Sequence, residues 1–150
     1  MFLGYYEHSI DEKGRLTIPA RFRELLSDGA FITQGFDQNL VVMPSTNFEK
    51  MYAKVNTMSM TNPAARQLRR LVFAHADRID LDKAGRILIP QFLRDSGKLD
   101  SNAIIVGVGD NFEIWNPDLW TQKDEKLQNP DDDPELFANL DLSMDLPWAW

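Results

Sequence analysis

The chain has 150 residues, of which 43% are hydrophobic and 26% charged, a composition typical of a globular protein. It contains no cysteine, which excludes disulfides, thiolate catalysis and cysteine-ligated metals, and its two histidines are too few for a histidine-rich metal site. No apolar run reaches the ~18–20 residues of a membrane helix, and the N-terminus lacks the regions of a secretory signal. We therefore expect a cytoplasmic protein without a metal, a cofactor or a membrane partner.

The net charge of −7 is concentrated at one end of the chain. Residues 124–150 contain eight acidic residues and one basic residue, whereas residues 1–123 contain 15 of each sign. The body is therefore neutral and can still present a local basic surface, which is what phosphate binding requires.

An internal repeat organises the body. Residues 11–23 and 82–94 share Asp, Gly, Arg, Ile, Pro and Arg at the same spacing, and residues 31–43 align with residues 103–115 in the same order. Two matched blocks in one order make chance similarity a poor explanation. The predicted organisation is a first repeat at 5–52, a helical connector at 53–77, a second repeat at 78–124, and an acidic tail at 125–150 that we expect to be disordered.

Each repeat predicts the same elements in chain order. An extended segment enters an Asp-x-x-Gly turn, whose glycine supplies a left-handed residue. A short apolar strand, a helix that begins at a proline and a second hairpin follow. Neither repeat has enough strand for its own core, so we expect an α+β fold in which the two halves interleave as a pseudo-dimer within the chain.

The two turns carry the candidate site. We expect Asp11 and Asp82 to accept backbone N–H groups, which leaves Arg15 and Arg86 at the exits of exposed turns, with Lys13 and Lys83 near the tips. The simplest alternative is a pair of ordinary hairpins with solvated cations. An arginine on a rigid turn suits bidentate contact with phosphate or guanine, and its repetition in both halves favours that interpretation.

Other features have simpler interpretations. Arg66, Arg69 and Arg70 form a helical face that is better explained by solvent or a subunit contact than by nucleic acid. The segment Gly107–Phe112 lacks the third glycine and the helix of a dinucleotide loop. His8 and His75 have no motif that pairs them with a nucleophile or metal, so we expect no catalytic residues, no small-molecule substrate and no enzymatic activity. The tail is either a solubilising segment or an acidic-aromatic segment that docks on a partner or on the chain's own basic face.

The body resembles the MraZ family of the SpoVT/AbrB superfamily. The resemblance covers about residues 1–127 and rests on both repeat motifs and their spacing. The specific matches are the opening Met-Phe-Leu-Gly, Asp11–Arg23, Thr61–Arg66, Asp82–Pro90 and Val106–Trp115.

The resemblance implies the swapped-hairpin β-barrel of AbrB-like proteins, flanked by helices and built here within one chain. It also implies sequence-specific binding to double-stranded DNA, association with the nucleoid, repression of a division and cell-wall gene cluster, and assembly into a ring of identical subunits. Because the subunits of such a ring present their loops in one polarity, we expect the operator to consist of short direct repeats. The DNA-contacting loops of the family carry over to Lys13, Arg15, Lys83 and Arg86. An antitoxin-like protein-interaction module with the same fold is the alternative function.

Two positions depart from the AbrB pattern. Glu24 and Asp95 stand where AbrB-type proteins often have a second basic residue. The sequence therefore leaves open whether Arg23 and Arg94 contact DNA or pair with acidic residues at a subunit interface.

Overall fold

The computed structural model describes residues 1–129, 131 and 135–140. The chain divides into two units, residues 1–117 and residues 118–150. Most of the predicted acidic tail lies outside the described residues. Of the part that is described, helix α5 (Pro117–Gln128) extends past the predicted start of the tail at residue 125, and backbone hydrogen bonds form turns within residues 135–140.

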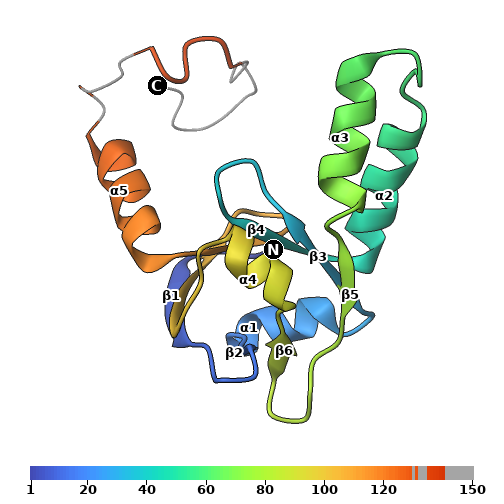
Figure 1. Ribbon diagram of the computed structural model, residues 1–150. Coiled ribbons are helices and arrows are strands. Elements are labelled where there is room, and N and C mark those ends of the chain that lie inside the picture. Colours follow the sequence, from blue (N-terminus) through green and yellow to red (C-terminus); the bar gives the residue numbers. More distant parts are fainter. Residues whose placement is uncertain (130, 132–134, 141–150) are drawn as a thin grey trace. The chain divides into compact units, whose positions relative to one another are not determined.

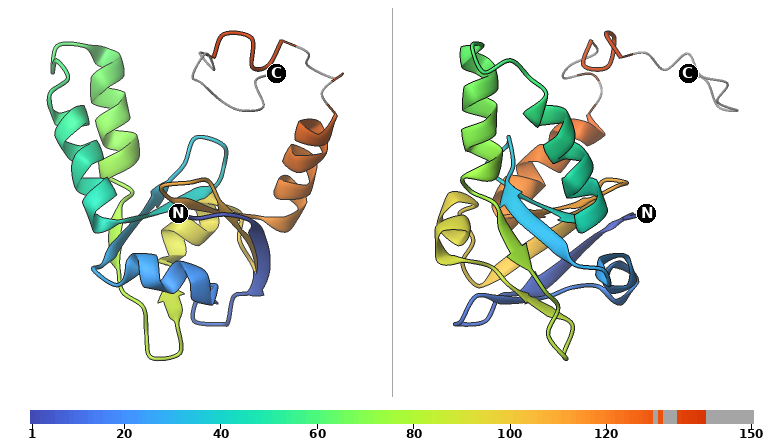
Figure 2. Two further views of the ribbon diagram at one scale, coloured as in Figure 1. Left: turned by 180° about the vertical axis from the view of Figure 1, so that it is seen from behind. Right: turned by 90° about the vertical axis from the view of Figure 1, so that its right-hand side faces the viewer.

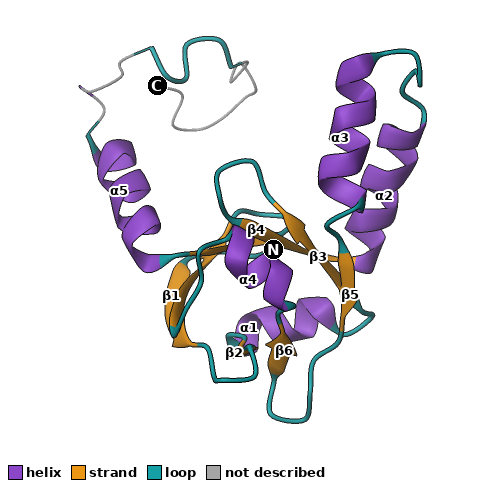
Figure 3. Cartoon of the chain, in the orientation of Figure 1, coloured by secondary structure: helices purple, strands orange, loops and turns teal. Residues whose placement is uncertain are grey.

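The first unit is built on a six-stranded sheet, coloured orange in Figure 3. All strand pairs in it are antiparallel. The sheet order is β1 (Tyr5–Ser9), β7 (Asn102–Gly107), β8 (Phe112–Trp115), β4 (Leu40–Pro44), β3 (Ala30–Gln34) and β5 (Asp77–Ile79). The two remaining strands, β2 (Arg15–Thr17) and β6 (Arg86–Leu88), pair with each other as a separate ribbon.

The two halves exchange strands. The first strand of each half pairs with the third strand of the other, β1 with β7 and β5 with β3. The ribbon β2–β6 and the pair β4–β8 also join strands from different halves. Neither half could therefore form this sheet alone, as the short strands of the repeat predict.

The α+β class is confirmed, but the expected closed barrel is wrong. Strands β1 and β5 are the two ends of the sheet order, and the ribbon β2–β6 does not join them. Between β1 and β2, Ile10 and Leu16 form an isolated bridge and not a continuous ladder. Because β2 and β6 have three residues each and pair with each other, they are too short to continue the ladder from one edge to the other.

Helices flank this body. Helix α1 (Ala20–Arg23) continues into a 3₁₀ turn (Glu24–Leu26), and α4 (Gln91–Ser96) is its counterpart in the second half. Helices α2 (Ser45–Asn56) and α3 (Pro63–Phe73) form a hairpin that projects from one end of the first unit (Figure 1). The turns that precede β2 and β6 lie at the opposite end in both orientations of Figure 2.

The core explains how the ribbon is held. Leu16, Ile18, Ile87 and Ile89 are all at most 1% exposed and belong to one cluster with the inner side chains of the sheet. Side chains alternate between the two faces of a strand. The same register therefore turns Arg15 and Arg86 away from the core.

Candidate nucleic-acid interface

The first turn is organised by the carboxylate of Asp11. Its Oδ1 accepts the backbone N–H of Lys13 at 3.0 Å and that of Arg15 at 2.8 Å. Its Oδ2 accepts Nε of the Arg15 side chain at 2.6 Å. Gly14 closes the turn with φ +88° and donates its N–H to the carbonyl oxygen of Asp11. The predicted capping role of Asp11 is confirmed, and the carboxylate also fixes the arginine side chain.

The second turn repeats this arrangement around Asp82. Its Oδ1 accepts the N–H groups of Ala84 and Arg86, both at 2.9 Å, and its Oδ2 accepts Nε of Arg86 at 2.9 Å. Gly85 has φ +75° and donates to the carbonyl oxygen of Asp82. Two turns of different sequence therefore hold an arginine in the same way.

The turn carboxyls are stabilised in their charged form. The backbone N–H of Arg15 lowers the pKa of Asp11 below its ordinary value, and the Arg15 side chain lowers it further. The backbone N–H of Arg86 and then its side chain do the same to the pKa of Asp82. Both carboxylates are therefore ionised near neutral pH, and the hydrogen-bond pattern of both turns is present there.

The ribbon brings the four predicted site residues to one end of the body. Its register places Arg15 opposite Leu88 and Thr17 opposite Arg86. Nη1 of Arg86 lies 3.8 Å from Oδ2 of Asp11, so one carboxylate contacts the arginines of both halves. Lys13 and Lys83 are exposed in the adjoining turns.

Each guanidinium is held through its Nε and keeps donors available. Within the part of the chain that the structure describes, the Nη groups of Arg15 and Arg86 make no hydrogen bond. Their side chains are 35% and 32% exposed. The planar group is thus oriented by the protein while part of its donor fork faces outward, an arrangement suited to bidentate acceptors such as phosphate or guanine.

The two halves are also joined at the ends of the ribbon. Ile18 donates its N–H to the carbonyl oxygen of Gly85, and Ile89 donates to that of Gly14, both at 2.9 Å. Each strand therefore ends against the turn of the other half.

The sequence left open what Arg23 and Arg94 contact. Nε of Arg23 donates to the carbonyl oxygen of Ile18 at 2.7 Å, and Nε of Arg94 donates to that of Ile89 at 3.0 Å. The guanidinium of Arg23 lies directly over Gly85, and that of Arg94 lies over Gly14. Each helix arginine therefore packs on the turn glycine of the opposite half. The sequence contains one sign of this contact, namely that the arginine and the glycine both occur in each repeat.

The basic face of α3 has a structural explanation. Nη1 of Arg66 donates to the carbonyl oxygen of Met60, and Nη2 of Arg69 donates to those of Asn56 and Met58. These two arginines brace the end of α2 and the connection to α3. These bonds are exposed, in agreement with a solvated face, and a subunit contact of this face stays a prediction.

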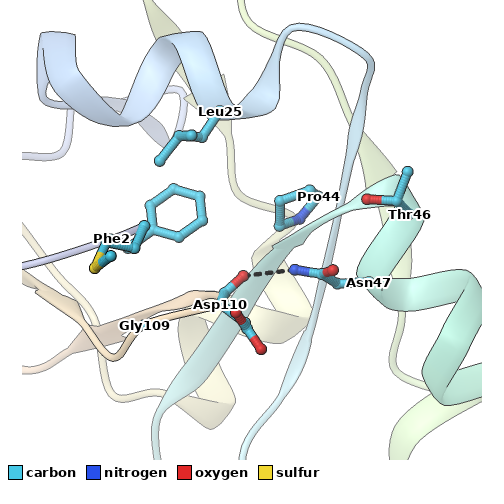
Figure 4. Close-up of a pocket in the computed structure, with 8 residues that line it drawn as sticks. Phe2, Leu25, Pro44, Thr46, Asn47, Gly109 and Asp110 are labelled. Atoms are coloured by element: carbon cyan, nitrogen blue, oxygen red, sulfur yellow. Dashed lines mark hydrogen bonds between the residues drawn. The ribbon is translucent and has the colours of Figure 1, made fainter.

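Two concave surfaces of the first unit are lined by residues outside the ribbon. One cavity of about 310 Å³ lies beside Phe2 and Leu25, where Nδ2 of Asn47 donates to the carbonyl oxygen of Asp110 (Figure 4). A second, of about 380 Å³, is lined mainly by apolar side chains between the sheet and the α2–α3 hairpin.

The two histidines and the other described residues form no metal-binding site. Nδ1 of His75 donates to the carbonyl oxygen of Leu71, and His8 lies in strand β1. Among residues 1–129, 131 and 135–140, no group of three acidic or histidine side chains is placed to hold a metal ion. In the same residues no helix is both long and apolar enough to cross a membrane.

The fold and the ribbon together define an internally duplicated α+β protein that gathers basic residues on two paired turns. Comparison with known proteins identifies the duplication. The family described as "MraZ protein, putative antitoxin-like" matches residues 1–71 and again residues 72–138. The chain belongs to the MraZ family.

Curated relatives support this assignment over most of their length. A protein of Herpetosiphon aurantiacus is 47% identical over 120 residues, covering 80% of this chain and 84% of that protein. One from Roseiflexus castenholzii is 46% identical over 138 residues, covering 92% and 94%. One from Lactiplantibacillus plantarum is 42% identical over 141 residues, covering 93% and 98%. All three are named Transcriptional regulator MraZ, which agrees with the expectation that this chain is not an enzyme.

Proposed function

We propose that this protein is a sequence-specific DNA-binding transcriptional regulator and that its reading surface is the β2–β6 ribbon with its two turns. The observation that carries the proposal is the pair of arginines, Arg15 and Arg86, each held through Nε by its own turn carboxylate. Lys13 and Lys83 add phosphate contacts, which supply affinity without reading sequence. The arginines supply the bidentate contacts that discriminate between base pairs.

The two repeats, 5–52 and 78–124, act as one reading unit. Because they exchange strands, they cannot separate and bind as independent domains. The chain uses its approximate two-fold internally, so identical subunits arranged head-to-tail in a ring each present the unit in the same direction. The operator is then a set of short direct repeats about one helical turn, ~10–10.5 bp, apart. The relatives' name supports transcriptional regulation, and we place the target in the chain's own division and cell-wall gene cluster, where binding represses transcription.

The experiment is a footprint on the DNA upstream of the chain's own coding sequence, followed by affinity measurements on the protected segment at several salt concentrations. Phosphate contacts predict a linear fall of log affinity with log salt. Inserting ~5 bp between adjacent repeats moves one repeat to the opposite face of the duplex, so it should weaken binding far more than inserting ~10 bp. Equal binding to both constructs would contradict the arrangement of subunits.

The antitoxin-like alternative has a distinct outcome. A protein-interaction module without specific DNA recognition would protect no segment, and its affinity for the upstream DNA would equal that for a scrambled duplex. A matched pair of variants separates the two functions. Arg15→Ala removes the proposed contact, whereas Lys50→Ala removes an exposed cation of α2, at the opposite end of the first unit. Only the first should abolish specific binding.

A further inference from the structure

The outer face of the ribbon carries one large apolar side chain. Leu88 is 56% exposed, although its neighbours Ile87 and Ile89 are buried in the core. Strand alternation places Leu88 on the same face as the two site arginines, and the register sets it directly opposite Arg15. The apolar side chain therefore lies on the proposed reading surface, beside Arg15.

Leu88 also breaks the approximate symmetry of the ribbon. The relation between the halves exchanges Arg15 with Arg86 and Leu16 with Ile87, which are equivalent in kind. It exchanges Leu88 with Thr17, which lies opposite Arg86. Four side chains of the two strands point outward. Two of them are arginines at equivalent positions, whereas the other two equivalent positions hold different residues, Thr17 and Leu88.

The surroundings of Leu88 indicate what it contacts. The face that bears it also bears Arg15 and Arg86 and adjoins the turns with Lys13 and Lys83. The turn carboxylates lie beside these cations, so the excess positive charge is small and comes from the lysines and the outward Nη groups. The exposed cations favour a polyanion such as DNA as the partner. The partner must also offer an apolar group that Leu88 can contact.

The major groove offers one such group. Among the base edges exposed there, the C5-methyl of thymine is the apolar one, and apolar side chains recognise it by contact. We propose that Leu88 is a specificity-determining residue that contacts the 5-methyl group of a thymine next to the base pair contacted by Arg15. Thr17 gives the other half of the ribbon a different preference, so each subunit reads its repeat in one direction. This inference rests on the proposed function.

The test uses the footprinted duplex with each thymine of one repeat replaced in turn by 2′-deoxyuridine, which removes only the methyl group. The wild-type protein should bind about fourfold more weakly at one or two positions, the factor that corresponds to ~0.8 kcal/mol for a buried methyl-sized group. Leu88→Ser, which has no methyl group, should lose this dependence at those positions. Leu88→Met retains an apolar side chain and should keep it.

Lys50→Ala is the control because it alters an exposed residue of α2, outside the ribbon. It should leave the positions sensitive to deoxyuridine unchanged. A second readout is how strongly the protein prefers an operator whose repeats all have the same orientation. Leu88→Thr places threonine at both unmatched positions, so this variant should discriminate less than the wild type against an operator with one inverted repeat.

Three results would overturn the inference. One is a wild-type protein indifferent to deoxyuridine at every position. Another is a Leu88→Ser variant that keeps the full dependence at the same positions. The third is dissociation of the assembled protein in Leu88→Thr, measured by light scattering, which would make Leu88 a subunit contact. The absence of any footprint would remove the proposed function together with this inference, whereas a footprint with a flat deoxyuridine scan would remove this inference alone.

Discussion

Arg23 and Gly85 should be energetically coupled although they are 62 positions apart in the sequence. The three atoms nearest to a Cβ placed on Gly85 all belong to the guanidinium end of Arg23. That end cannot simply swing away, because Nε donates to the carbonyl oxygen of Ile18 at 2.7 Å. A methyl group at Gly85 must therefore displace Arg23 and break this bond.

The structure gives the magnitudes. At φ +75° an alanine costs about 1–2 kcal/mol of backbone strain. A hydrogen bond from a charged donor contributes about 1.5–3 kcal/mol. Gly85→Ala should lose both, about 2.5–5 kcal/mol in total, and Arg23→Ala should lose the hydrogen bond alone. The double variant has no guanidinium left to displace, so it should be about as stable as Gly85→Ala. The coupling is then about 1.5–3 kcal/mol.

The measurement is the free energy of unfolding in urea for the wild type, both single variants and the double variant at one protein concentration. The matched control combines Gly85→Ala with Arg94→Ala, because Arg94 packs on Gly14 instead. The control pair should be additive within about 0.5 kcal/mol. Additivity of Arg23→Ala with Gly85→Ala, or equal coupling in both pairs, would refute the reciprocal packing of the two halves.

Three further predictions concern binding, pH and the tail. Because each lost contact costs about 1–3 kcal/mol in every engaged subunit, Arg15→Ala should abolish specific operator binding and Arg86→Ala should weaken it, without dissociating the protein; unchanged affinity in the double variant would contradict the site. Because the backbone N–H of Arg86 lowers the pKa of Asp82, the stabilisation from this carboxylate is fully present above about pH 4 and is lost as the pH falls through the lowered pKa. Asp82→Asn should therefore flatten the fall in unfolding free energy between about pH 5 and pH 2, and parallel curves would contradict this. Deleting residues 129–150 removes six acidic and no basic residues, so it should tighten DNA binding at low salt and have little effect at high salt; an equal gain at both would exclude charge as the cause.

Local chemistry made the turns predictable. An Asp-x-x-Gly-Arg segment contains its own acceptor, its own left-handed glycine and the N–H groups that the carboxylate binds, all within five consecutive residues. The structure shows these bonds at Asp11 and again at Asp82. The cap of α3 was predictable for the same reason, since Oδ1 of Asn62 accepts the N–H of Ala64 two residues later.

Contacts between the halves were not predictable in this way. The packing of Arg23 on Gly85 depends on the register of β2 against β6, which no short segment encodes. The same register places Leu88 opposite Arg15, and the repeat alone does not reveal it. The expected barrel failed for a related reason. Closure depends on whether a three-residue strand continues a ladder across a turn, and the isolated bridge between Ile10 and Leu16 shows that it does not.

The exchange of strands within one chain has a consequence for recognition. In a dimer of identical halves, positions 17 and 88 would hold the same residue, and the reading face would be symmetric and suited to palindromes. Here the buried positions that support the ribbon remain equivalent in kind, and Arg23 and Arg94 bind each half to the turn of the other. The outward positions are free to differ, as Thr17 and Leu88 do, because neither is needed for the core. The buried side of the ribbon is therefore nearly symmetric, whereas its outer face is asymmetric. An asymmetric reading face favours operator repeats that all have the same orientation.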